Sequence, residues 1–239
     1  MNQPAVTCRI EDGIARLRLD DGKANAINLA FIEALDGALS QAEAAQAAIL
    51  IEGRPGFFSG GLDLKSLPFL EPPALRHVLA EFGRVMMRLF GFPRPVVARA
   101  SGHAIAGGAV VLLTADERYQ SRGAYRNGLN ETALGIALPR FIIEMARAQL
   151  PAWALHPMIA GGGLFSPDEA LRMHLFNEVG DEASMEARAL ERVKALAALP
   201  AEAYRVNKLA LRGDALAAGK AAYAAELEAF AVYFAAMKR

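Results

Sequence analysis

Short runs of purely apolar residues alternate with helical patterns along the first three quarters of this chain. Residues 48–51 and 95–98 carry no polar side chain, which is typical of strands covered on both faces of a parallel sheet. Between them, residues 75–89 repeat apolar side chains at helical spacing after two prolines. This order predicts an α/β fold. Only helical patterns follow residue 183, so we expect a core at 1–183 and a C-terminal helical region at 184–239.

The N-terminal part of the chain predicts a β-hairpin. Residues 6–11 and 14–19 alternate in polarity, and the Asp-Gly pair between them is a common hairpin turn. After a loop at 20–26, Asn28 is expected to cap a helix. Further strands are predicted at 116–120 and 176–179, and helices at 139–150, at 151–160 and from the capping box at Ser166 to about residue 174.

The charge balance argues against a nucleic-acid or membrane partner. The 239 residues contain 26 basic and 26 acidic side chains, so no net charge attracts a polyanion. The longest uncharged run, at 100–115, is shorter than the roughly 18 apolar residues of a membrane span, and the N-terminus lacks a signal-peptide pattern. The single cysteine, Cys8, excludes an internal disulfide and suits a reducing cytoplasm; we expect it to be a core thiol.

Motifs that bind metals or nucleotides are missing from the sequence. The histidines have no ligand-like spacing, His-Glu-x-x-His does not occur, and no Walker A or Gly-x-Gly-x-x-Gly sequence follows a strand. We therefore expect no metal site. His103 could act as a general base, but its small neighbours favour a structural role.

Two glycine-containing turns are the first candidates for a functional site. One is formed by residues 60–63, and the other by residues 106–108 at the start of an apolar helix. Turns that lack large side chains leave backbone N–H groups accessible, and a helix N-terminus adds partial positive charge. Two such donors on one oxygen would form an oxyanion hole, which suits an enolate derived from a thioester. The alternative is that both are ordinary turns.

Glu131 is the only acidic residue between Glu117 and Glu144. This interval also contains four arginines, and the immediate neighbours of Glu131 are mostly apolar. Glu131 is therefore either a surface residue or an isolated base. A base beside an oxyanion hole is what formation of an enolate requires.

Several segments resemble the signature sequences of the crotonase (enoyl-CoA hydratase/isomerase) superfamily. Residues 58–64 and 103–108 resemble its two main motifs in composition, order and separation, and residues 23–26 resemble its N-terminal loop. Within the superfamily, residues 128–135 are most similar to the mitochondrial-type Δ3,Δ2-enoyl-CoA isomerases. The resemblance extends from about residue 6 to the C-terminal helices.

The resemblance implies a spiral of ββα units followed by C-terminal helices that form a homotrimer or a dimer of trimers. It implies an acyl-CoA substrate, so that coenzyme A arrives with the substrate and no separate cofactor is needed. It also implies that the N–H groups of Leu62 and Gly107 hold the thioester oxygen while Glu131 moves protons. Substrate contacts are then expected at Lys23, Ala24, Ala26, Gly60, Gly61, Leu62, Asp63, Leu64, Gly107 and Val110.

One position departs from the hydratases of this superfamily, which use two glutamates. The first of these positions is Val110 here, and only the second is kept, as Glu131. A single carboxylate positions water poorly but can still transfer a proton from C2 to C4. We therefore expect an isomerase of the fatty-acid β-oxidation type that converts 3-enoyl-CoA to trans-2-enoyl-CoA. The alternatives are a hydratase, another acyl-CoA reaction such as thioester hydrolysis or decarboxylation, or a silent acyl-CoA binder.

Acyl-chain length and assembly depend on residues that the motifs do not specify. Candidates for closing the acyl pocket are Phe69, Leu70, Phe82, Met86, Phe90 and Phe92, and Glu71 or Glu81 could supply a second carboxylate. An aromatic-rich C-terminal helix either packs on the core or, as we expect, completes a trimer interface. Its aromatic residues are Tyr223, Phe230, Tyr233 and Phe234.

Overall fold

The computed structural model describes residues 4–237 and contains two β-sheets. The larger sheet places β1 beside β2 in antiparallel register, confirming the predicted hairpin, and its other neighbouring strands are parallel. Its order is β1 (Val6–Glu11), β2 (Ile14–Leu19), β3 (Ala48–Glu52), β5 (Val96–Ala100), β7 (Glu117–Ser121) and β9 (Glu178–Gly180). Strand β9 begins two residues later than predicted.

The smaller sheet is parallel and consists of β4 (Gly56–Ser59), β6 (Gly102–Ile105) and β8 (Asn127–Gly128). None of these three segments was predicted as a strand from the sequence. The strands are only two to four residues long, too short for an alternating pattern. Their close approach depends on glycine, because a Cβ on Gly102 would overlap the backbone of Gly56.

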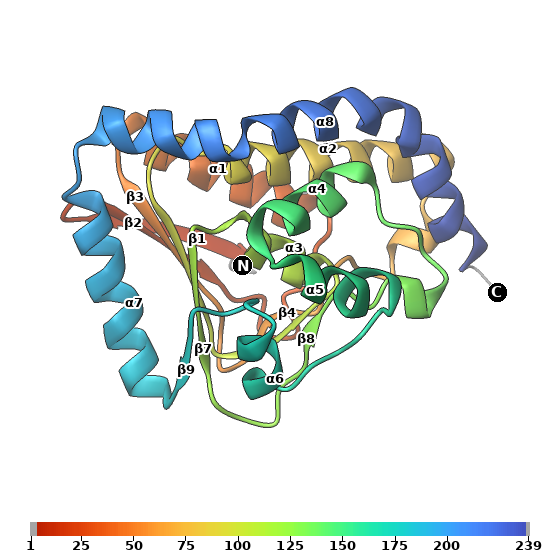
Figure 1. Cartoon of the computed structure of the whole chain (residues 1–239). Helices are drawn as coiled ribbons and strands as arrows, with labels where there is room; N and C mark the ends of the chain where they lie inside the picture. The colour runs from red at the N-terminus through yellow and green to blue at the C-terminus, as the bar shows by residue number, and fades with distance from the viewer. Residues whose placement is uncertain (1–3, 238–239) are drawn as a thin grey trace.

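Successive strands enter the two sheets in turn, which builds the predicted crotonase-like spiral of ββα units. Strands β3 and β4 precede α2 (Pro72–Phe90), β5 and β6 precede α3 (Gly107–Thr114), and β7 and β8 precede α4 (Arg140–Gln149). Each turn therefore delivers one loop from the smaller sheet to the same region of the molecule. Figure 1 shows the smaller sheet below the helical layer formed by α2, α3 and α4.

The remaining helices follow the predicted positions closely. Asn28 caps α1 through a 3.0 Å hydrogen bond from the Phe31 N–H, and Ser166 forms the predicted capping box with Glu169. The predicted helix at 151–160 is a short α-helix continued by a π-helical turn. The bounds are α1 (Leu29–Ala44), α5 (Ala152–Leu155), α6 (Pro167–Arg172), α7 (Glu182–Ala197), α8 (Ala201–Ala236), the 3₁₀ turns η1 (Leu67–Phe69) and η2 (Thr132–Leu134), and the π-helical turn η3 (His156–Ala160).

The two C-terminal helices pack on different parts of the body (Figure 1). Helix α7 covers the larger sheet, where Met185, Ala189 and Val193 join a second core cluster. Helix α8, which is 36 residues long, runs along α2 and α4. The ring of Tyr223 lies against Gly83, and its hydroxyl donates to the Leu79 carbonyl.

This packing corrects the expected role of the aromatic residues on α8. Tyr223, Phe230 and Phe234 are buried in the core of this chain, and Tyr233 is half-buried against it. Tyr223, Phe230 and Phe234 are buried without a second subunit, because α8 packs along α2. These aromatic rings therefore do not form an exposed interface.

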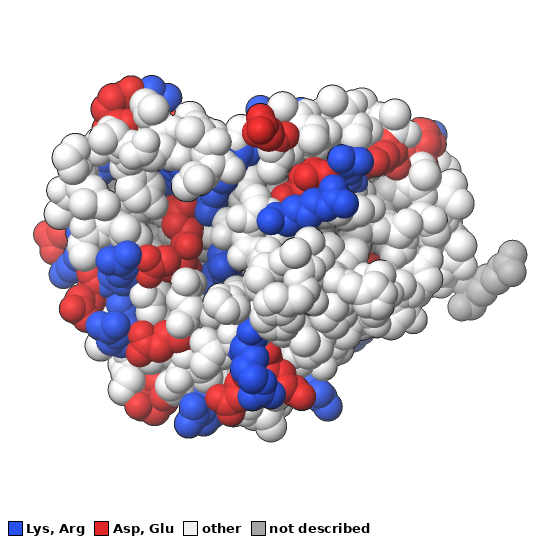
Figure 2. All heavy atoms as spheres, viewed as in Figure 1, with Lys and Arg blue, Asp and Glu red and all other residues white. Residues whose placement is uncertain are grey.

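Charged side chains are distributed unevenly over the surface of the molecule. Figure 2 shows acidic and basic side chains intermixed over the larger sheet and α7, and a broad uncharged area toward the C-terminal end of α8. In the part of the chain from 4 to 237, no helix has the length and apolarity to cross a membrane.

Cys8 is half-buried rather than enclosed, because β1 is an edge strand, and burial raises the pKa of its thiol.

Candidate active site

A cavity of about 270 Å³ lies where the loops of the smaller sheet meet the helices. It brings together five of the predicted site residues, which come from three separate turns of the spiral. They are Gly60, Leu62, Leu64, Gly107 and Glu131. Leu64 and Leu134 are the lining residues most exposed to solvent, at 40% and 42%, and mark the mouth of the cavity.

The first turn of the site is fixed by a dense set of backbone bonds. The Gly60 N–H donates to the Ala24 carbonyl at 2.8 Å, and Leu62 forms a bridge with Ile27. Gly61 has φ +89°, and a Cβ there would lie 2.9 Å from the Ile105 carbonyl oxygen. Glycine is therefore required both by the backbone conformation and by the close approach of the two turns.

The second turn stores backbone strain at the start of α3. Ala106 has φ 52° and ψ −122°, a region that residues with a side chain rarely adopt. Its N–H donates to the Gly128 carbonyl at 2.9 Å, which holds the turn in place. The strained turn sets Gly107 as the first residue of α3, where the helix dipole supplies partial positive charge.

The two turns touch, and their free N–H groups line the same cavity. A Cβ on Gly107 would lie 3.3 Å from the Leu62 nitrogen, so no side chain separates them. Within residues 4–237, neither the Leu62 N–H nor the Gly107 N–H donates a hydrogen bond. Both donors are available to an oxygen atom bound in the cavity.

Glu131 is a buried carboxylic acid, which excludes the reading that it is a surface residue. Its exposed fraction is 7%, and its Oε2 is buried without a hydrogen-bond partner in the described part of the chain. Desolvation raises the pKa of Glu131 to about 7, although its own backbone N–H partly opposes the shift. A carboxyl group with this pKa can accept and return a proton near neutral pH.

Asn130 is a site residue that sequence reasoning did not identify. It lines the cavity beside Glu131, and its Oδ1 is likewise buried without a partner among residues 4–237. Among residues 4–237, Asn130 and Glu131 are the only lining residues with polar side chains. Its position immediately before the candidate base was the available signal.

The second carboxylates considered from the sequence lie elsewhere. Glu71 and Glu81 do not line the cavity, and Glu81 forms an ion pair with Arg84. Val110 lies fully buried in the first turn of α3 and does not line the cavity. Glu131 is therefore the only carboxylate that lines the cavity in the described structure.

The loop at residues 23–26, where substrate contacts were expected, lies beside the cavity. The carboxylate of Asp21 accepts hydrogen bonds from the backbone of Lys23, Asn25 and Ala26, and Ala24 binds Gly60 as described above. Lys23, Ala24, Ala26, Gly61, Asp63 and Val110 do not line the cavity. The backbone hydrogen bond between Ala24 and Gly60 thus attaches this loop to the first turn of the site.

Of the six residues considered from the sequence for the acyl pocket, only Phe82 lines this cavity. Met86, Phe90 and Phe92 are buried in the core, and Phe69 is 65% exposed. Helical spacing identifies the buried face of α2 but does not tell which part of that face meets a cavity. The other apolar walls are Ile105, Ile136, Ile142, Phe230 and Phe234.

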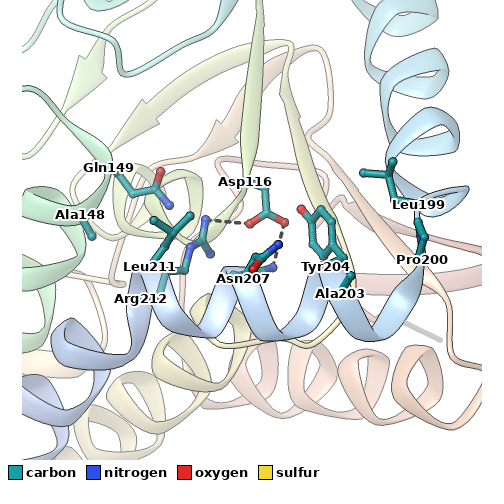
Figure 3. A pocket seen from close by; sticks show the side chains of 11 residues that line it. Asp116, Ala148, Gln149, Leu199, Pro200, Ala203, Tyr204, Asn207, Leu211 and Arg212 are labelled. Atoms are coloured by element: carbon teal, nitrogen blue, oxygen red, sulfur yellow. Dashed lines mark hydrogen bonds and ion pairs between the residues drawn. The ribbon is translucent and has the colours of Figure 1, made fainter.

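A larger cavity, of about 550 Å³, lies between α8 and the ends of α4 and α7. Figure 3 shows Asp116 at its centre, and ion pairs of 2.8 Å join this residue to Lys208 and to Arg212. Arg212 also donates to the carbonyls of Phe90 and Thr114 at the ends of α2 and α3. The charged groups of Asp116, Lys208 and Arg212 thus hold α8 to the rest of the molecule, so we assign them a structural role.

The histidines do not contribute to the cavity. His103 accepts a 3.0 Å hydrogen bond from the Arg126 N–H and its ring packs between Phe57 and Tyr125, which confirms the structural role. Within residues 4–237, no three His, Cys, Asp or Glu side chains are grouped as a metal site would need.

The chain is similar to known acyl-CoA enzymes over nearly its whole length. The family model described as enoyl-CoA hydratase/isomerase matches residues 9–239. Human mitochondrial enoyl-CoA delta isomerase 1 is 29% identical over 84% of this chain and 68% of its own. A probable enoyl-CoA hydratase of Bacillus subtilis is 32% identical over 83% of this chain and 76% of its own.

Solved structures agree with this relationship. An enoyl-CoA hydratase/isomerase family protein of Pseudomonas syringae has a TM-score of 0.89 and 31% identity, covering 95% of this chain and 98% of that one. Human mitochondrial delta3-delta2-enoyl-CoA isomerase has a TM-score of 0.92 and 25% identity, covering 96% of this chain and 92% of that one.

Proposed function

The chain belongs to the enoyl-CoA hydratase/isomerase family, and from this we propose that it is an isomerase that converts 3-enoyl-CoA to trans-2-enoyl-CoA. The observation that carries the proposal is the solitary, buried Glu131 in a cavity that also contains two free N–H donors. The similarity to the human isomerases supports the same choice.

The N–H groups of Leu62 and Gly107 bind the thioester oxygen in this proposal. Removing a proton from C2 turns the carbonyl oxygen into an enolate oxygen, and its negative charge grows in the transition state. Donors that are fixed before the reaction stabilise this charge, each by on the order of 3 kcal/mol. The strained Ala106 turn and the Gly61 turn hold the two donors in place.

Glu131 carries the proton between the two carbon atoms. Its ionised carboxylate takes a proton from C2, which forms the dienolate, and the resulting carboxylic acid returns a proton to C4. The double bond thereby moves from C3–C4 to C2–C3, and Glu131 regains its charge. A pKa of about 7 suits both steps, because the group is neither a very weak base nor a very weak acid.

The apolar walls favour isomerisation over hydration. Addition of water needs a water molecule positioned against C3 and groups that exchange its protons. In the described part of the chain, Glu131 is the only carboxylate at the cavity, and most of the other lining residues are apolar. A dry cavity also protects the 2-enoyl product from hydration.

A direct comparison of two substrates tests the proposal. Purified protein is supplied with 3-hexenoyl-CoA and, separately, with crotonyl-CoA, and the products are quantified by chromatography. We expect 2-hexenoyl-CoA to form much faster than crotonyl-CoA is hydrated. Hydration that equals or exceeds the double-bond shift would contradict the proposal.

A hydratase remains the second candidate, because one observation favours it. Asn130 places a buried, unpaired amide oxygen beside Glu131, and a carboxamide can help to hold a water molecule. The similarity to the Bacillus subtilis probable hydratase is consistent with this alternative. An Asn130→Leu variant distinguishes the two, since it should abolish hydration but leave most of the isomerisation.

We also propose that the chain forms a trimer or a dimer of trimers. The interface does not use the buried aromatic rings of α8. Instead, α8 exposes Leu211 at 82%, Val206 at 49% and Val232 at 63%, which are large apolar residues facing solvent. Light scattering should give a mass close to three or six times 25.5 kDa; the mass of a monomer would contradict the proposal.

A further inference from the structure

We propose that the C-terminal end of α8 limits the length of the acyl chain and makes this protein selective for short- and medium-chain thioesters. This inference rests on the proposed acyl-CoA function. It concerns Phe230 and Phe234, which sit on successive turns of α8. Both rings line the cavity, although they are far from its catalytic residues in the sequence.

The two phenylalanines form a fixed aromatic wall. Their exposed fractions are 3% and 1%, and their ring centroids are 5.2 Å apart at an interplanar angle of 89°. Phe82 from α2 and Ile142 from α4 line the same cavity. The polar groups that would bind the thioester come from turns at one part of the cavity. The acyl chain of a thioester bound there would therefore lie among Phe82, Ile142, Phe230 and Phe234.

Helix α8 is anchored up to four residues before Phe230, where the Glu226 carboxylate accepts a 2.7 Å hydrogen bond from the Arg140 N–H, so a longer chain cannot readily displace this wall. A Cβ on Gly219 would lie 2.8 Å from the Cβ of Phe141, and Tyr223 packs on Gly83 with a hydrogen bond to α2. Arg212 ties the preceding part of α8 to Phe90 and Thr114. Close helix packing of this kind resists expansion of the cavity.

The volume of the cavity gives the expected limit. An apolar cavity of about 150 Å³ holds a benzene molecule with its six carbons. By the same measure, the cavity of about 270 Å³ holds roughly ten non-hydrogen atoms, including those of the thioester. The acyl chain that fits therefore has about eight carbons.

Binding of saturated acyl-CoA thioesters from C4 to C16 tests the inference without requiring turnover. Each buried methylene should tighten Kd by about fourfold until the cavity is full near C8, and longer chains should bind more weakly than C8, because the wall leaves no room for them. Phe234→Ala should move this break to longer chains by at least two carbons. Phe234→Leu, which keeps most of the core packing, should move it less but in the same direction.

Leu227→Ala is the matched control, because Leu227 lies on the same helix, is half-buried against the core and does not line the cavity. This variant should keep the wild-type break. Two results would overturn the inference. One is a Kd that continues to fall to C16 in the wild type, and the other is a break that stays at the wild-type chain length in both Phe234 variants. Length-limited binding without turnover of any 3-enoyl-CoA would refute the proposed function and leave the length limit standing.

Discussion

Replacing Glu131 with glutamine should remove activity and at the same time stabilise the fold. The carboxyl group is buried without a partner for Oε2 among residues 4–237, and desolvation raises its pKa from 4.5 to about 7. At about 1.4 kcal/mol per pKa unit, this shift corresponds to about 3 kcal/mol. The folded protein bears this penalty whenever Glu131 is ionised.

The stability gain should depend on pH in a defined direction. Between pH 4.5 and about 7, the folded protein keeps a proton on Glu131 that the unfolded chain has lost. The free energy of unfolding contributed by this group therefore falls as pH rises through that interval. The Glu131→Gln variant should be more stable than wild type by about 3 kcal/mol at pH 8, and by about 1 kcal/mol or less at pH 5.

Urea denaturation at pH 5 and pH 8 measures this difference. Glu33→Gln, on the exposed face of α1, is the control and should match wild type at both pH values. An equal stability of Glu131→Gln and wild type at pH 8, or a gain of the same size at both pH values, would refute the reasoning about desolvation.

The same titration should appear in catalysis. Because the ionised carboxylate removes the C2 proton, kcat/KM for 3-hexenoyl-CoA should rise with pH and level off above about pH 7, the pKa raised by burial of Glu131. Stopped assays across pH 5–9 test this; a rate that does not change between pH 5 and pH 8 would exclude Glu131 as the titrating base.

Three further substitutions test the scaffold. Gly108→Ala should lower activity at least tenfold, measured with 3-hexenoyl-CoA, because a Cβ would overlap the backbone of β4; wild-type activity would contradict the tight turn. Asp116→Asn should lower the free energy of unfolding in urea by about 3–5 kcal/mol, since two buried cations lose their carboxylate. Gly83→Ala should destabilise by about 1–3 kcal/mol, because the methyl group would overlap the ring of Tyr223. Gly213→Ala, with open space around its Cα, is its control and should not lower Tm.

The elements that the sequence predicted correctly are those with a regular pattern of burial. The hairpin, the buried strands and α2 follow from period-2 alternation, apolar runs and helical spacing. The smaller sheet was missed because its strands are short and depend on contacts between segments more than twenty residues apart, such as Gly56 with Gly102. Local patterns do not contain that information.

The residues of the candidate site likewise divide into those that were predicted from the sequence and those that were not. Glu131 was predicted as the only acid in its interval, and the resemblance to the crotonase superfamily implied Leu62 and Gly107; the fold brings all three to one cavity. Phe230 and Phe234 were assigned to an interface because helical spacing defines a buried face but not the element that covers it. Asn130 was missed because its only signal in the sequence is its position next to Glu131.

Isomerisation of 3-hexenoyl-CoA in deuterated water, followed by NMR and mass spectrometry, tests the central claim most directly. If Glu131 alone carries the proton, the wild type forms 2-hexenoyl-CoA, part of which keeps the transferred protium at C4, and Glu131→Gln forms none. Formation of 2-hexenoyl-CoA by Glu131→Gln at the wild-type rate, or 3-hydroxyhexanoyl-CoA as the main initial product of the wild type, would contradict the account.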